Sequence, residues 1–137
     1  MRMLVLAAHP DDEVLGCGGT MARAVRRGDD VRIVILGEGI TSRFERREEA
    51  DPRELDRLRD SARRAAEALG VGPPRMHGLP DNRFDTVPLL DVVKLVEREV
   101  REFRPDVVFT QHGGDLNIDH VVTFRATLVA TRPTDAC

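Results

Sequence analysis

The chain has 137 residues, the size of one domain with one hydrophobic core, which excludes a two-domain organisation. With 41% hydrophobic and 33% charged residues its composition is globular, and no apolar run approaches the roughly 20 residues of a transmembrane helix. A net charge of -3 and the lack of Trp and Tyr argue against nucleic acid as a partner.

Two observations bear on the compartment. One Arg leads directly into an apolar strand pattern, so no secretory signal is visible. The two cysteines, Cys17 and Cys137, do not make a disulfide framework, and Cys17 is expected to be a small packed residue of the first helix. We therefore expect a cytoplasmic protein.

Apolar runs and helical periodicity alternate along the chain. Continuous apolar runs, typical of strands buried on both faces of a parallel sheet, cover residues 2–8 and 31–36, and weaker strand patterns cover residues 75–79 and 107–110. Helical spacing of apolar residues follows each run, over residues 14–27, 55–69, 89–103 and 118–131. The alternation predicts an α/β fold, a Rossmann-like three-layer sandwich with a mostly parallel sheet.

Two polar segments, residues 39–53 and 78–86, are expected to be loops. Each follows a predicted strand, so both should lie at the carboxyl edge of the sheet, where open α/β folds bind ligands. The charged residues 44–54 are either a solvated loop or a lid over a ligand site.

The strongest chemical signal directly follows the first predicted strand, and reads His9-Pro10-Asp11-Asp12-Glu13. The first turn of a helix favours acidic residues, so capping accounts for one or two of the three carboxylates. It explains neither His9 nor the crowding of acids, whose repulsion a bound cation would relieve. The motif favours a metal site with His9 and Asp12 among its ligands.

A third ligand is expected from residues 111–120, after the fourth predicted strand. In a parallel sheet the first and fourth strands can be neighbours at a topological switch point, which would bring this loop beside His9. We select His120. Two histidines and one carboxylate, with a fourth position left to water, are typical of catalytic zinc, so the predicted cofactor is Zn²⁺.

Five motifs carry a resemblance to a known family: AHPDDE, GCGGT, LPDNRFDTVPLL, RPDVVFT and DLNIDH. Together they resemble the LmbE-like, or PIG-L, family of zinc-dependent N-acetylglucosaminyl deacetylases, over almost the whole chain. The resemblance implies that His9, Asp12 and His120 are zinc ligands and that Asp11 is the general base. Members of the family usually continue further, so we expect residues 1–137 to form a single deacetylase domain that lacks its C-terminal part.

Two departures from the family pattern leave roles open. Many members carry a histidine three residues before the last ligand, where it polarises the substrate carbonyl, but Asn117 stands there in this chain. His112 is the candidate to replace that histidine as a catalytic group, with Asn117 in substrate binding. The family's substrate-binding arginine would fall between Arg57 and Arg59, and Arg59 is our candidate.

The resemblance implies a hydrolase that removes acetyl from an N-acetylated amino sugar or its conjugate. Asp11 deprotonates a zinc-bound water that attacks the acetamide carbonyl, zinc stabilises the oxyanion, and Asp11 or His112 protonates the leaving amine. One alternative is a non-catalytic or incomplete metal-binding remnant of the same fold. A response-regulator receiver domain is more remote, because Asp81 is a poor match for its phosphorylated residue and the only lysine, Lys94, falls in a predicted helix.

Two further expectations concern single features. His77 is expected to be structural, as a lone histidine near a strand end usually is. The last predicted helix carries an apolar set that longer relatives would ordinarily cover, consisting of Ile118, Val121, Val122, Leu128 and Val129. Since uncovered apolar surface tends to be buried by association, we expect a homo-oligomer.

Overall fold

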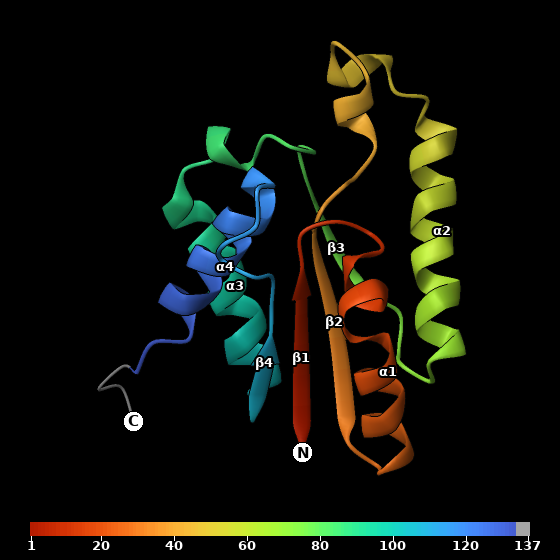
Figure 1. Cartoon of the computed structure of the whole chain (residues 1–137), viewed down its shortest axis with the longest axis vertical. Coiled ribbons are helices and arrows are strands. Elements are labelled where there is room, and N and C mark those ends of the chain that lie inside the picture. The colour runs from red at the N-terminus through yellow and green to blue at the C-terminus, as the bar shows by residue number, and fades with distance from the viewer. Residues whose placement is uncertain (134–137) are drawn as a thin grey trace.

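A computed structural model describes residues 1–133, and Cys137 lies outside them (Figure 1). Four strands and four α-helices alternate along the chain, in the order β1 (Arg2–Ala7), α1 (Asp12–Arg26), β2 (Asp30–Gly37), α2 (Pro52–Ala68), β3 (Arg75–Leu79), α3 (Leu89–Phe103), β4 (Val107–Phe109) and α4 (Ile118–Ala130). The strands form one sheet in the order β3-β2-β1-β4, and all three pairings are parallel. The predicted α/β class is confirmed.

The sheet separates two hydrophobic clusters. Successive side chains of a strand point to opposite faces. In β1, Met3 and Val5 pack in the cluster that holds Met21 of α1 and Ala62 of α2. Leu4 and Leu6 pack instead in the cluster that holds residues of α3 and α4. Figure 1 accordingly shows α1 and α2 on one side of the sheet and α3 and α4 on the other, which makes three layers.

Two helices begin earlier than their apolar periodicity predicts. The first helix begins at Asp12 rather than at residue 14, and α2 begins at Pro52 rather than at residue 55. Asp51 caps α2, because its side chain accepts a hydrogen bond from the backbone N–H of Arg53 at 2.9 Å. Polar first turns carry no apolar signal, which is why the periodicity misses them.

The two polar segments are not wholly irregular. The segment after β2 holds two 3₁₀ turns, η1 (Thr41–Arg43) and η2 (Arg47–Glu49), and its last residues belong to α2. The segment after β3 holds a third turn, η3 (Phe84–Thr86). Both follow strands, as predicted, and so begin at the carboxyl edge of the sheet.

The order of the strands places the ends of β1 and β4 side by side. Met3 pairs with Val107 and Val5 with Phe109, so β1 and β4 are neighbours although two strands separate them in sequence. The chain leaves β1 towards β2 through α1 and reaches β4 from the far edge of the sheet through α3. The predicted switch point is confirmed, and it brings together the loops that follow these two strands.

Two surface properties complete the fold. Among residues 1–133, no helix combines the length and the apolar character needed to span a membrane. Several large apolar side chains near the C-terminal helix are exposed: Leu116, Ile118, Leu128 and Val129.

Candidate active site

Three connections meet at the carboxyl edge of the sheet. His9 follows β1, Asp81 follows β3, and His120 lies in the first turn of α4, beyond the loop that follows β4. These segments are far apart in the sequence but converge around the imidazole of His9. The site therefore exists only in the folded chain.

His9, Asp12 and His120 offer three ligand atoms that all lie within 4.8 Å of one another. The Oδ2 atom of Asp12 is 3.4 Å from Nδ1 of His9 and 3.3 Å from Nε2 of His120, and the two imidazole centroids are 5.3 Å apart. Two ligands at 2.0–2.2 Å from one ion lie at most about 4.4 Å apart, so these distances suit a shared ion. The structure thus brings together the three residues that the sequence selects as ligands.

The other ring nitrogen of His9 faces buried acid. Its Nε2 atom is 2.9 Å from Oδ2 of Asp119 and 3.3 Å from Oδ1 of Asp81. Asp119 is fully buried, and its two oxygens also accept hydrogen bonds from the backbone N–H groups of Asn82 at 2.6 Å and Phe84 at 2.9 Å. Since an ionised carboxylate only accepts, Nε2 of His9 donates to Asp119, and Nδ1 is the ring nitrogen that faces Asp12 and that would bind an ion once it has lost its proton.

His120 is oriented in the same way. Its Nδ1 atom is 2.9 Å from Oδ2 of Asp115, which leaves Nε2 free on the side of Asp12. Asp12 is itself held, because its Oδ2 accepts hydrogen bonds from the side-chain amide of Gln111 and from the backbone N–H of His9, both at 2.8 Å. Each of the three ligand candidates thus has a partner that fixes its direction.

Asp81 and Asp119 also form a group with His9 whose atoms lie within 4.8 Å. Both oxygens of Asp119 are occupied by backbone N–H groups, and Oδ2 of Asp81 accepts from the hydroxyl of Ser42 at 2.6 Å. We therefore interpret this second group as the hydrogen-bonded support of His9.

The crowding of acids strongly favours positive charge at the site. Burial by itself lowers the pKa of His9, but its hydrogen bonds with Asp119 and Asp12 raise that pKa to about 10. Burial also opposes ionisation of Asp12, yet the hydrogen bonds from His9 hold its pKa below the usual value. A divalent cation would balance the negative charge of the same acids, and nitrogen and oxygen donors suit a transition metal.

Asp11 has a different environment from Asp12. Partial burial and the neighbouring charge of Asp12 raise the pKa of Asp11. Its side chain does not cap α1, so helix capping does not account for it. Its backbone has φ 132° and ψ -30°, a conformation that costs free energy in an L-residue, and its N–H donates to Oε2 of the buried Glu13 at 3.0 Å.

The two other predicted residues of the β4–α4 loop lie at its surface or serve the fold. His112 is exposed, and its ring lies over Gly114, where an added Cβ would be 2.8 Å from Nε2 of His112. Asn117 caps α4, since its side-chain oxygen accepts from the backbone N–H of Asp119 at 2.9 Å, while its amide donates to Asn82 at 3.1 Å. The catalytic role of His112 and the substrate-binding role of Asn117 stay predictions.

Arg59 is not gathered around His9. It is exposed on α2, pairs with Asp56 at 3.1 Å, and borders a hollow that also includes His77. Its assignment to the substrate likewise stays a prediction. His77 pairs with Glu99 at 2.9 Å, in keeping with the structural role expected for it.

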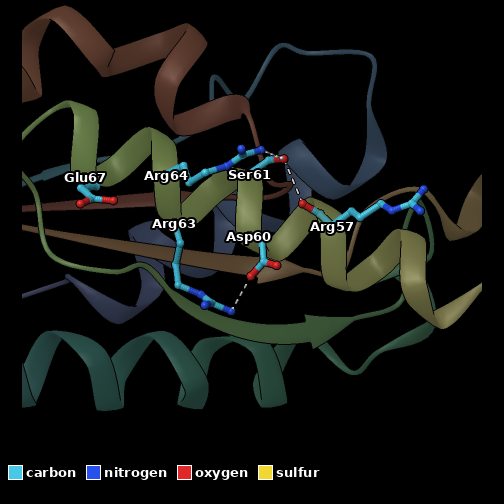
Figure 2. Close-up of a pocket in the computed structure, with 6 residues that line it drawn as sticks. All are labelled: Arg57, Asp60, Ser61, Arg63, Arg64 and Glu67. Carbon is cyan, nitrogen blue, oxygen red and sulfur yellow. Dashed lines mark hydrogen bonds and ion pairs between the residues drawn. The ribbon is translucent and has the colours of Figure 1, made fainter.

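A hollow of about 650 Å³ runs along α2 (Figure 2). Figure 2 shows two of its arginines held by neighbours on the helix: Arg63 pairs with Asp60 at 3.0 Å, and Arg64 with the hydroxyl of Ser61 at 3.5 Å. Its lining includes neither His9 nor another site residue. We therefore place the candidate active site at the edge of the sheet rather than in this hollow.

The polar segment after β2 is anchored at two points, Ser42 and Arg47. Arg47 binds the buried carboxylate of Glu38 through two hydrogen bonds, at 2.8 and 2.7 Å. The backbone N–H of Ser42 donates to Asp81 at 3.0 Å. Through Asp81 this segment therefore reaches the support of His9.

Four residues of the site escaped assignment from the sequence: Asp81, Gln111, Asp115 and Asp119. Asp119 had one usable signal, its position directly before His120 in the first turn of a helix. For Asp81 the sequence indicated only that residues 78–86 lie at the carboxyl edge of the sheet, and the fold was needed to show that it contacts His9.

Comparison with known proteins gives one family. Residues 4–131 match the PIG-L family, described as GlcNAc-PI de-N-acetylase. A 1D-myo-inositol 2-acetamido-2-deoxy-alpha-D-glucopyranoside deacetylase of Mycobacterium sp. (strain KMS) is 35% identical over 152 residues, covering 94% of this chain and 49% of the relative. A mycothiol S-conjugate amidase of Streptomyces coelicolor is 31% identical over 150 residues, covering 95% of this chain and 51% of the amidase.

A solved structure has the same fold. The N,N'-diacetylchitobiose deacetylase from Pyrococcus horikoshii superimposes with a TM-score of 0.80 at 25% identity, over 94% of this chain and 48% of that one. The chain spans about half the length of the relatives that it matches. Since the family match covers most of the chain, the protein belongs to the PIG-L family, and not to the receiver domains that an acidic pair after the first strand also allowed.

Proposed function

We propose that this chain is a zinc-dependent amide hydrolase that removes acetyl from an N-acetylated glucosamine conjugate. The observation that carries the proposal is the group of His9, Asp12 and His120, whose candidate ligand atoms lie within 4.8 Å of one another and whose charges act on the neighbouring Asp11. The class of reaction is supported by relatives named as deacetylases and as an amidase.

His9, Asp12 and His120 would hold the Zn²⁺, and the ion would supply positive charge that activates water and stabilises the developing oxyanion. The chain supplies the proton transfers. Asp11 accepts the proton of the attacking water, and the raised pKa of its carboxyl suits it to take up a proton and return it to the leaving amine. The C–N bond of the amide breaks, and acetate and a free amine result.

The supporting residues keep the geometry constant during the reaction. Asp119 holds the ring of His9 and Asp115 that of His120, so the nitrogens that face Asp12 keep their direction. His112 is the further proton donor that we propose, because it lies in the same loop as Asp115 and is exposed to an incoming substrate.

Acetate release from the inositol conjugate of N-acetylglucosamine and from N,N'-diacetylchitobiose tests this proposal. We expect acetate and amine in equal amounts, loss of activity with a chelator, and its return with Zn²⁺. The variant His120→Ala should lose most of its zinc and all measurable turnover, because two remaining ligands hold the ion poorly. His77→Ala is the matched control, since His77 pairs with Glu99 away from the site.

The same experiment separates the alternative. Zinc bound in equal amount to the chain, with no acetate released from either substrate, would identify a metal-binding remnant of the fold. Retention of all zinc by His120→Ala would instead show that the ligand assignment is wrong.

A further inference from the structure

An apolar groove opens beside Asp11, between the start of α1 and the middle of α2. Its volume is about 340 Å³. Asp11, Glu13 and Ser61 border it, and its remaining lining is carbon, contributed by Pro10, Val14, Leu15, Leu58, Ala62 and Ala65. Figure 1 shows the two helices running beside each other on the same face of the sheet.

Two residues of the groove are closely packed against the loop after β2. Leu58 and Pro10 approach the backbone of Gly39 so closely that an added Cβ would lie 2.9 Å from Leu58 and 3.1 Å from Pro10. Gly39 also has φ +72°, which disfavours a side chain there. At the other wall, Leu15 leaves 81% of its surface exposed in the first turn of α1.

The residues that α2 presents to this groove are not charged. They are Leu58, Ser61, Ala62 and Ala65, whereas the adjacent Arg59 pairs with Asp56 and borders a different hollow. A sugar would leave hydroxyl groups without partners against such a wall, and an unpaired buried polar group is costly. Amide and carboxylate side chains gather instead around His9, on the β3–α3 connection and on α4.

The groove borders the proposed site at Asp11, which lines the groove and is the proposed base. A base that activates the attacking water lies next to the carbonyl carbon of the substrate. The substituent bonded to that carbon is the acyl chain, so the acyl chain is the apolar part of the substrate best placed to enter.

We propose that this groove is an acyl-chain subsite, which takes the aliphatic chain of an N-acyl amino sugar longer than acetyl. The inference rests on the proposed amide hydrolysis and extends it. Water adds to the carbonyl carbon, the C–N bond breaks, the proton passes to the amine, and the products are a fatty carboxylate and a free amino sugar.

The test compares N-acetylglucosamine with N-hexanoylglucosamine on the chain loaded with Zn²⁺. The hexanoyl chain would bury several methylene groups in the groove and so remove them from water. We therefore expect kcat/KM for the hexanoyl amide to exceed that for the acetyl amide by about tenfold or more. In Leu15→Gln the ratio of kcat/KM for the hexanoyl amide to that for the acetyl amide should fall towards one. The reason is that a polar side chain of similar size replaces the apolar side chain at the exposed wall of the groove. Ser61→Phe, which adds a ring at the rim, should lower the ratio as well.

Leu90→Gln is the matched control. Leu90 is an exposed leucine in the first turn of α3, on the opposite face of the sheet, and its replacement should leave the ratio unchanged. Equal kcat/KM for the two amides, or a preference for acetyl, would overturn the acyl-chain subsite and leave the proposed deacetylation intact.

Methyl NMR decides the subsite independently of turnover. N-hexanoylglucosamine, but not N-acetylglucosamine, should shift the methyl signals of Leu15, Leu58 and Ala65. If neither amide is hydrolysed, the proposed function is wrong, and the NMR shifts alone test the groove. Shifts with N-hexanoylglucosamine would support an acyl-binding groove, and their absence would overturn it.

Discussion

His9 and Asp119, 110 residues apart in the sequence, are joined by a contact of 2.9 Å between Nε2 and Oδ2. The carboxylate is fully buried and also accepts two backbone N–H groups, so it cannot turn away from the ring. One buried acid thereby fixes both the tautomer and the direction of a proposed metal ligand.

The substitution Asp119→Asn tests this relationship. It places an amide where Asn82 and Phe84 donate hydrogen bonds, and it weakens the hold on His9. We expect the affinity for Zn²⁺ to fall by about 10- to 100-fold, measured by competition with a chelator. Asp85→Asn, an equal change of charge at an exposed position, is the control. Unchanged affinity in Asp119→Asn would show that His9 is oriented by other contacts.

Substitutions of the neighbouring acids Asp11 and Asp12 should impair the protein in different ways. Asp11→Asn should keep its zinc and lose deacetylation by about 10²- to 10⁴-fold, the usual contribution of a positioned general base. Asp12→Ala should lose zinc first, because its Oδ2 lies between the two histidines. Metal analysis combined with acetate release distinguishes them, and the reverse pattern would exchange the two roles.

Metal uptake should release a proton. The pKa of His9 is raised to about 10 in the metal-free protein, above the 6.5 of an ordinary histidine. Protonated His9 therefore stabilises the metal-free fold below pH 6.5, and this contribution is lost as the pH rises through about 10. Because the ring must lose its proton to bind Zn²⁺, we expect release of about one proton at pH 7, and tighter binding as the pH rises.

Calorimetry in buffers of different ionisation enthalpy measures this release. The observed heat should depend on the buffer near neutral pH and lose that dependence above about pH 10. A heat that is independent of the buffer at pH 7 would mean that His9 is already neutral in the metal-free protein.

Thr123 offers a test of stability away from the chemistry. Within the described part of the chain, its hydroxyl is the only buried side-chain oxygen or nitrogen without a hydrogen-bond partner. Since an unsatisfied buried hydroxyl costs free energy, Thr123→Val should raise the free energy of unfolding by about 1 kcal/mol, measured by urea denaturation. Thr127→Val is the matched control and should destabilise, because its hydroxyl donates to the carbonyl of Thr123 at 2.8 Å.

Exposed apolar side chains near α4 should cause self-association. Leu116 is fully exposed, and Leu128 and Val129 leave 55% and 39% of their surface exposed. Light scattering should give a mass that rises above the 15.3 kDa of one chain with concentration. The double variant Leu128→Gln with Val129→Gln should lower that mass, whereas Leu15→Gln, on another face, should not. A monomer at every concentration would contradict this expectation.

The local sequence pattern was sufficient to predict the strands and helices but not the residues at which they begin and end. Continuous apolar runs predict β1 and β2 because both faces of these strands are buried, and apolar spacing predicts the body of each helix. The first turn of α2 was missed because its start depends on Asp51 as a cap and on Pro52, neither of which contributes to apolar periodicity.

The sequence by itself determined the α/β alternation and was sufficient to predict that His9, Asp12 and His120 lie close together, because the ends of parallel strands share one edge of the sheet. Only the tertiary structure decided which atoms of these residues face one another. Asp119, Asp115 and Gln111 impose that choice through contacts of 2.8–2.9 Å, and the contacts of Asp119 and Gln111 join residues 110 and 99 positions apart, which leave no local signal. The apolar groove beside Asp11 likewise depends on two helices meeting, which periodicity within either helix does not reveal.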